Sequence, residues 1–314
     1  MNGLKFICTV MIGAPLLLQS CGSGTPGKTD TPTSGHAFIS VDESYRLILD
    51  AELDMFHYLY KDAHVTAEVK PEGDVINTLL NNDSCRAAMI ARKLTEEEKN
   101  FLKSKKIYPI ETKVAVDAVA VIVNNDNPSD SMTMQHLRDI LKGAISRWNQ
   151  VDSTAKPDSL HLIFDGNNSA NARYLNEKFL DGKGNFPGNC FAVKGNQAVI
   201  DYVSKNPNSV GIISVNWISD RDDSLSNSFL KNVKAVAFSS DNNPYLFYQP
   251  FAAYIADGSY PLTRDVYMIN REGRSGLGTG FIAFVAGEKG QRIILKAGMV
   301  PATMPVRLIQ IKTE

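Results

Sequence analysis

The run "VAVDAVAVIV", residues 114–123, decides how this chain is built. It is apolar except for Asp117, and such a continuous apolar run is typical of a strand buried on both faces of a sheet. An acid inside a buried strand is costly unless it is hydrogen-bonded. We therefore expect Asp117 either to hold neighbouring backbone or to accept a hydrogen bond from a ligand.

Short apolar runs alternate with helix-like segments on both sides of this strand. In "TEEEKNFLKSK", residues 95–105, a threonine followed three residues later by Glu98 predicts a capping box at a helix start. "MTMQHLRDILKGAISRW", residues 132–148, places four apolar residues on one helix face: Leu137, Ile140, Leu141 and Ile145. Strands that alternate with helices predict an α/β fold with its sheets buried on both faces. A body of roughly 280 residues exceeds one core, so two lobes are expected.

The N-terminus has the layout of an exported protein. Residues 1–20 carry one positive charge and an apolar centre that is too short and broken to span a membrane, as in a secretory signal peptide. The segment ends in "LQSC", which matches the bacterial lipobox, so Cys21 is the expected lipidation site. Residues 21–35 are rich in Gly, Ser, Thr and Pro and predict a flexible tether. The body is thus expected on the periplasmic side of the cell envelope, anchored to a membrane; the alternative is an ordinary signal cleaved nearby.

Charge and cysteine usage exclude several classes of protein. Removal of the predicted signal peptide takes away Lys5 and leaves 32 of the 33 basic residues, against 34 acidic ones. This near-neutral balance lacks the excess of positive charge that is typical of nucleic-acid-binding proteins. Cys85 and Cys190 either bridge or remain free thiols, and no spacing of Cys or His predicts a metal site. No cofactor motif stands out: "GLGTG", residues 276–280, lacks the spacing and the acid of a dinucleotide loop. Because no nucleophile and base pair can be chosen either, the chain is expected to be a binder and no enzyme.

Three polar clusters lie at strand-to-helix transitions, where open α/β sheets collect ligands. The first contains Ser44, the second Arg92, and the third is the loop "DGNNSAN", residues 165–171. Amides at a helix N-terminus favour an anion. Each cluster alone is equally explained as an ordinary helix cap.

The order of motifs along the chain is more specific than any one of them. Over residues 38–312 the chain resembles the phosphate-binding lipoproteins of bacterial ABC transporters, in the branch with a periplasmic-binding-protein-like type II fold. The motifs that carry the resemblance are "ISVDESY" (39–45), "ARKLTEEE" (91–98), "VAVDAVAVIVNNDNP" (114–128), "LRDILKGAISRW" (137–148), a serine-containing loop that opens a helix, "AVIDYVSKNPNSVGIIS" (198–214), "YPLTRDVYMI" (260–269) and "GFIAFVAGEKGQRIILKAGMVP" (280–301).

The resemblance implies a monomeric two-lobed clamp that captures phosphate or a related oxyanion and delivers it to an ABC permease. Lobe 1 would comprise residues 36–120 and 252–314, and lobe 2 residues 121–251. Two crossing strands would join them, near residues 117–124 and 250–262, with the ligand cleft between the lobes.

It also implies ligand-binding roles at the three positions that match the family, which are Ser44, Arg92 and Ser169. Further candidate ligand-binding residues come from the sequence itself: Asp117 in the buried strand, and Asp165, Asn168 and Asn171 in the loop. Family members hold phosphate with hydroxyls and amides at helix N-termini, an Arg, and a carboxylate that accepts the proton of hydrogen phosphate.

The chain also departs from the family pattern. Its loop reads Ser169-Ala170-Asn171 where the family has Ser-Gly-Thr, and Asp165 stands where relatives often have an anion-binding Arg. An acid at that position repels a dianion. Either Arg92 supplies the cation while Asp165 points away or accepts a proton of the ligand, or the pocket has drifted from phosphate towards another ligand. The expected alternatives are a sensor or binder of a different small ligand with the same fold, or a surface-anchored hydrolase. Arg173 is a further cation candidate, although its spacing favours a pair with Glu177.

Overall fold

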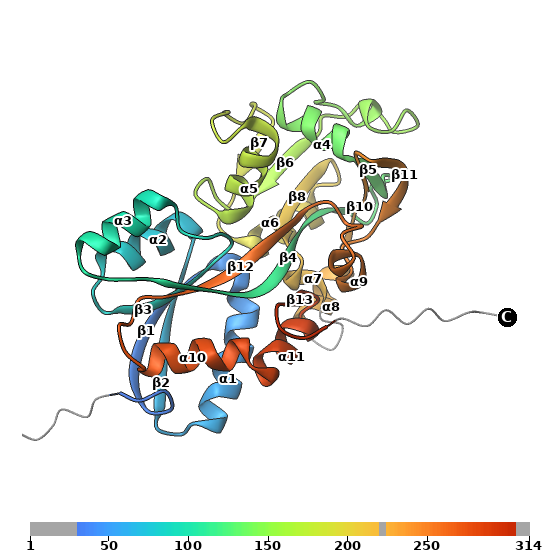
Figure 1. The fold of residues 1–314 in the computed structure, drawn as a ribbon. Helices are drawn as coiled ribbons and strands as arrows, with labels where there is room; N and C mark the ends of the chain where they lie inside the picture. The colour runs from blue at the N-terminus through green and yellow to red at the C-terminus, as the bar shows by residue number, and fades with distance from the viewer. Residues whose placement is uncertain (1–29, 220–223, 306–314) are drawn as a thin grey trace, which may run out of the picture.

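The computed structural model describes residues 30–219 and 224–305 (Figure 1). Its strands are β1 (Gly35–Asp42), β2 (Ala63–Lys70), β3 (Cys85–Ile90), β4 (Ile110–Asn124), β5 (Ser131–Thr133), β6 (His161–Phe164), β7 (Cys190–Ala192), β8 (Ser209–Ser214), β9 (Val233–Ala235), β10 (Ala237–Ser240), β11 (Asn243–Tyr248), β12 (Thr263–Asn270) and β13 (Val300–Pro301). Its helices are α1 (Arg46–Leu59), α2 (Glu72–Asn81), α3 (Glu96–Ser104), α4 (Met134–Leu141), α5 (Ala170–Leu180), α6 (Asn196–Lys205), α7 (Asn216–Ser219), α8 (Ser224–Leu230), α9 (Ala252–Ala256), α10 (Leu277–Ala286) and α11 (Glu288–Lys296). Two 3-10 helices span Glu43–Tyr45 and Trp148–Gln150.

Strand β4, which contains the apolar run 114–123, connects the two parts of the main sheet. Its residues 110–118 pair antiparallel with β12, and its residues 119–123 pair antiparallel with β8. The described strands of the main sheet therefore run in the order β2-β1-β3-β12-β4-β8-β6-β7, with β9 and β13 also paired to β4. Figure 1 shows β4 and β12 running together from one part of the molecule to the other.

Two lobes are built on the two ends of this sheet. In the first, β1 pairs parallel with β2 and β3, and α1 and α2 connect these strands. In the second, β6 pairs parallel with β7 and β8, and α5 and α6 connect them. Parallel neighbours need such crossover connections. The predicted α/β fold with two lobes is confirmed.

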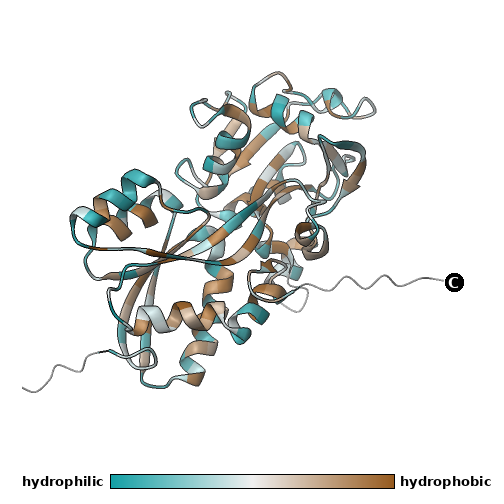
Figure 2. Cartoon of the chain, viewed as in Figure 1, coloured by the Kyte–Doolittle hydropathy of each residue, from teal (hydrophilic) through white to brown (hydrophobic). Residues whose placement is uncertain are grey.

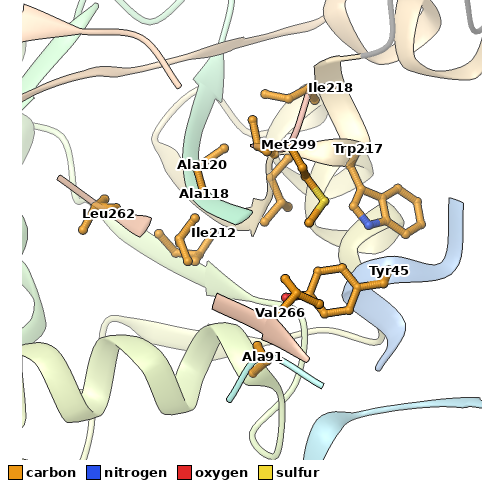
Figure 3. Close-up of a cluster of buried hydrophobic side chains, with 14 of the residues drawn as sticks. Tyr45, Ala91, Ala118, Ala120, Ile212, Trp217, Ile218, Leu262, Val266 and Met299 are labelled. Carbon is orange, nitrogen blue, oxygen red and sulfur yellow. The ribbon is translucent and has the colours of Figure 1, made fainter. Parts of the chain in front are cut away.

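The core lies where β4 passes between its neighbours. From Val114 to Asn124, only Val116 is not fully buried. Figure 2 shows apolar residues gathered along the inner strands, with polar residues on the outer faces of helices such as α3. Figure 3 shows side chains from β4, β8 and β12 meeting Tyr45 and Trp217 in one apolar cluster. The burial of β4 on both faces is the property that its composition predicts.

The local helix predictions hold with one difference. The Thr95–Glu98 capping box is present at the start of α3, as predicted. The helix predicted within residues 132–148 begins at Met134 but ends at Leu141, so Ile145 lies beyond it, although it is buried. Gly143 has a φ of 79°, which ends the helix there because this conformation favours glycine.

The predicted tether is shorter than expected within the described residues. Strand β1 already begins at Gly35, and Asp30 is docked on the first lobe. The Asp30 carboxylate accepts a hydrogen bond of 3.0 Å from the Leu277 backbone N–H at the start of α10, and it pairs with Arg274. The predicted signal peptide, Cys21 and the tether up to residue 29 lie outside the described residues. No helix in the described part of the chain has the length and hydrophobicity to cross a membrane.

Candidate functional site

The first corner of the site follows β1. Asp42, the last residue of β1, accepts a hydrogen bond of 3.2 Å from the Ser44 backbone N–H through Oδ1 and so caps the Glu43–Tyr45 turn. The backbone oxygen of Ser44 accepts hydrogen bonds from Asn216 Nδ2 and from Trp217 Nε1, at 2.8 and 3.0 Å. Both Asp42 and Ser44 are fully buried. Hydrogen bonds from α7, which follows β8 of the second lobe, thus hold this corner in place.

The second corner follows β6 and contains the loop 165–171. Ser169 caps α5, since its hydroxyl accepts a hydrogen bond from the Ala172 backbone N–H at 3.1 Å. Asp165 Oδ2 accepts hydrogen bonds from the side-chain amides of Asn171 at 2.9 Å and Asn196 at 3.1 Å. The loop amides therefore hold a carboxylate of their own chain, and burial raises the pKa of Asp165 to about 6.

The two corners meet across the lobes through Glu43. Its carboxylate accepts a hydrogen bond of 3.0 Å from the backbone N–H of Asn196, the first residue of α6. The Asn196 side-chain amide also donates to Glu43. Because the same amide contacts Asp165, one asparagine joins the corner after β1 to the corner after β6. The N-terminus of a helix can bind an anion. At the N-terminus of α6, the Glu43 carboxylate occupies that position.

The α2 corner makes a second set of contacts between the lobes. Glu72, the first residue of α2, is buried and accepts hydrogen bonds from Arg173 on α5 and from the Ala91 backbone N–H. Beside it, the Gly73 N–H donates to the Asn168 backbone oxygen at 3.2 Å. Arg173 also pairs with Glu177 at 2.7 Å, which confirms the predicted pair. The cross-lobe pair with Glu72 is the one that the spacing did not predict.

These contacts border a cavity of about 310 Å³ between the lobes. Its lining includes Glu72 and Gly73 from the first lobe and Asn168, Ser169 and Arg173 from the second. Cavities at the carboxyl ends of strands are the usual ligand sites of open α/β sheets. Three of the predicted site residues, Arg92, Asn168 and Ser169, line this one.

A buried ion pair lies beneath the corners. Arg264 on β12 donates to Asp117 Oδ2 from Nε at 3.0 Å and from Nη2 at 2.8 Å, and Ser214 donates to the other oxygen at 2.8 Å. Burial raises the pKa of Asp117, although Arg264 and Ser214 oppose the shift. Burial also pulls the pKa of Arg264 down, but Tyr45 and Asp117 more than offset it. Both carboxylate oxygens of Asp117 are occupied, so the structure favours its role in holding the fold over contact with a ligand.

Arg92 does not face the corners in the way that the sequence predicts. Its guanidinium makes two hydrogen bonds to Glu98, at 2.8 and 2.7 Å, and a third to the Lys93 backbone oxygen. The same Glu98 closes the capping box of α3. Arg92 therefore lines the cavity with a guanidinium that is paired with Glu98 of its own lobe. The cation that acts on both Asp42 and Asp165 is Arg264.

The structure thus brings Ser44, Asp165, Ser169 and Asn171 into one buried network. The residues that sequence reasoning missed are Asp42, Glu72, Asn196 and Arg264. Glu72 follows the strand run "VTAEVK" and opens a helix, so the same strand-to-helix rule that selected Ser44 applies to it. Arg264 lies in "YPLTRDVYMI", and a buried acid such as Asp117 requires a nearby cation.

A family model for the PBP superfamily domain matches residues 26–289. The chain therefore belongs to the PBP superfamily. It is 26% identical over 313 residues to the phosphate-binding protein PstS of Staphylococcus aureus (strain USA300), which covers 96% of this chain and 89% of that protein.

Solved structures of phosphate transport proteins are among those that share this fold. One is a proposed phosphate ABC transporter substrate-binding protein of Clostridium perfringens with bound phosphate, with a TM-score of 0.70, 20% identity, and coverage of 86% of this chain and 100% of that one. Another is an ABC-type phosphate transport receptor of Vibrio cholerae, with a TM-score of 0.62, 22% identity, and coverage of 85% and 100%.

Proposed function

We propose that this protein is a non-enzymatic solute receptor that captures phosphate or a related oxyanion between its lobes for an ABC permease. The observation that carries the proposal is the convergence of three strand-to-helix corners, after β1, β2 and β6, on buried polar contacts between the lobes. The ligand is taken from the relatives, which are phosphate-binding proteins. Closure of the lobes would commit the solute to transport.

We propose that residues 36–120 with 252–314 form one lobe and residues 121–251 the other. The change of partner along β4 between Ala118 and Val119 supports a crossing there. The return crossing near residues 250–262 is supported by its position directly before β12. Rotation about these two connections would open the cleft.

We also propose that the receptor acts as a monomer on the periplasmic side of the cell envelope, held to a membrane by a lipid on Cys21. This proposal rests on the lipobox sequence and on the export layout of residues 1–20. Several acyl chains hold a protein far better than one does. Mass spectrometry of membrane-extracted protein tests it, since the Cys21→Ser variant would lose the lipid mass.

One observation favours a second ligand class, a small solute with a protonated amine. We define the carboxyl cluster as the five acids at the corners and beneath them: Asp42, Glu43, Glu72, Asp117 and Asp165. Among the described residues, the guanidiniums that contact the cluster are those of Arg173 and Arg264. When all five acids are ionised, the cluster attracts a cation and repels an anion.

Calorimetry on the purified mature protein tests the function and separates the two ligand classes. The titrants are phosphate, sulfate and a panel of small amines. Saturable binding of phosphate supports the proposal. Binding of an amine with no heat from either oxyanion would keep the receptor and replace its ligand, and no binding to any titrant would reject the receptor itself.

A further inference from the structure

Several buried polar atoms of the site have no hydrogen-bond partner within the protein. They are Asp42 Oδ2, Ser44 Oγ, Asp165 Oδ1, Asn171 Oδ1, Asn216 Oδ1 and Arg264 Nη1. Asp42 is 0% exposed and Asp165 is 4% exposed. Buried polar atoms are almost always paired. A group of unpaired ones from β1, the 3-10 helix after it, the loop after β6, α5, α7 and β12 therefore indicates a place where a ligand completes the bonding.

Asp42 and Asp165 come from different lobes, and each carboxyl uses one of its oxygens in hydrogen bonds within the protein. Asp42 Oδ1 caps the Ser44 turn, and Asp165 Oδ2 holds two asparagine amides. Each carboxyl therefore has a fixed orientation and one oxygen to spare. They lie within electrostatic reach of each other.

The charged groups around Asp42 and Asp165 are mostly negative. Asp42 is influenced by Glu72 of α2, Asp165 after β6 and Arg264 of β12, and Asp165 by Glu43 and Arg264. Arg264 is engaged by Asp117 of β4 and has Tyr45 beside it, while Arg173 of α5 is engaged by Glu72 and Glu177.

An oxyanion does not fit beside two ionised carboxylates, since like charges at short range strongly oppose binding. A protonated carboxyl, in contrast, is a hydrogen-bond donor, as are the hydroxyl of Ser44 and Nη1 of Arg264. Carboxylic acids kept neutral by their surroundings act as such donors at neutral pH in enzymes. Burial raises the pKa of Asp165 to about 6 and, together with Glu72, holds the pKa of Asp42 well above its ordinary value.

We propose that Asp42 and Asp165 bind the oxyanion as protonated carboxyls, one from each lobe, so that capture takes up protons and strengthens as the pH falls. This rests on the proposed function, and it reconciles the ligand of the relatives with the acids of this chain. The protons come from solvent or arrive with the ligand. Asp117 has no part in the uptake, because both of its oxygens are already bonded to Arg264 and Ser214.

The variants Asp165→Asn and Asp42→Asn are close mimics of the protonated acids. In each, the amide oxygen can keep the internal bonds of the original carboxylate, and the amide nitrogen takes the position of the spare oxygen as a donor at any pH. Glu97→Gln, on the exposed surface of α3, is the matched control for loss of one negative charge. Thermal unfolding checks that each variant is folded.

The experiment is phosphate calorimetry from pH 5.5 to 8, in buffers of different ionisation enthalpy, on wild type and the three variants. For each proton taken up, the wild-type affinity is expected to rise about tenfold per pH unit as the pH falls. Each Asp→Asn variant should take up about one proton fewer and bind more tightly than wild type at pH 8. The titration of phosphate itself is common to all proteins and cancels in the comparison.

Equal proton uptake in wild type, Asp165→Asn and Asp42→Asn would overturn the inference while leaving phosphate as the ligand. Phosphate binding at no pH would overturn both the inference and the oxyanion ligand. An amine whose affinity rises with pH would establish ionised carboxylates instead. If one Asp→Asn variant fails to fold, the other variant and the wild-type proton count still decide the question.

Discussion

Asp117 and Glu52 are both buried acids in regular elements, and they differ in what surrounds them. Asp117 bonds Arg264, Ser214 and Tyr45. Glu52, on α1, is 2% exposed, and neither of its carboxylate oxygens has a hydrogen-bond partner within the described residues. Burying an ionised group is tolerated only with compensating partners. The two residues should therefore respond in opposite ways to removal of their charge.

Glu52→Gln is expected to stabilise the protein at pH 7. Burial raises the pKa of Glu52 to about 8, far above its value in an unfolded chain. Between these values the folded state binds the extra proton, so wild type loses roughly 1.4 kcal/mol of stability per pH unit as the pH rises. Urea unfolding should show an advantage of the variant that grows from pH 5 to pH 8. Asp54→Asn, at an exposed position of the same helix, is the control and should show no such growth.

Asp117→Ala is expected to destabilise the protein by about 3–5 kcal/mol, because it leaves the buried guanidinium of Arg264 without its partner. Replacing both members of such a pair with apolar residues is often close to neutral. The double variant Asp117→Ala with Arg264→Met should therefore recover most of the loss in urea unfolding. It should still bind phosphate poorly, since the free Nη1 is gone. An Asp117→Ala variant as stable as wild type would contradict this account.

At the scale of elements, the strands and their corners were the most predictable features. The apolar run 114–123 predicts a strand buried on both faces, and β4 is one. Ser44 and Ser169 were predicted at strand-to-helix corners and lie there. The contacts across the corners were not predictable, because they join residues far apart in the sequence. Glu43 and Asn196 are an example, with no local pattern that relates them.

The start of α3 shows why a residue type at the right corner is not enough. Arg92 stands at such a corner. However, Glu98 both closes the capping box of α3 and pairs with the Arg92 guanidinium. The sequence predicts the Thr95–Glu98 capping box and the corner position of Arg92 independently of each other. That both use the one carboxylate of Glu98 appears only when the loop geometry is known.

Arg92→Ala is consequently expected to change phosphate affinity by less than about threefold, or roughly 0.7 kcal/mol. The free energy of unfolding should fall by about 1 kcal/mol, as for a partly exposed ion pair. Parallel calorimetry and urea unfolding check both values. A loss of affinity by orders of magnitude would instead restore Arg92 as a ligand-binding residue.

At the scale of the whole molecule, the lobes are held together by contacts of the chain itself. Glu72 with Arg173, Gly73 with Asn168 and Glu43 with Asn196 all join the first lobe to the second. A receptor must exchange its solute with solvent, so these contacts have to open and close. Their strength sets the balance between the open and closed forms, and a ligand shifts it only through its preference for one of them.

Arg173→Gln is expected to shift this balance toward the open form. The guanidinium of Arg173 bonds both oxygens of buried Glu72 and the backbone oxygen of Ala91, and a glutamine would leave the carboxylate without its charge partner. Small-angle X-ray scattering of the ligand-free protein should show a larger radius of gyration than for wild type. Glu177→Gln removes only the other partner of Arg173, on the same helix, and should leave the radius unchanged. If Arg173→Gln also scatters like wild type, the remaining contacts suffice for closure, and the Glu72 pair contributes to stability without controlling the motion of the lobes.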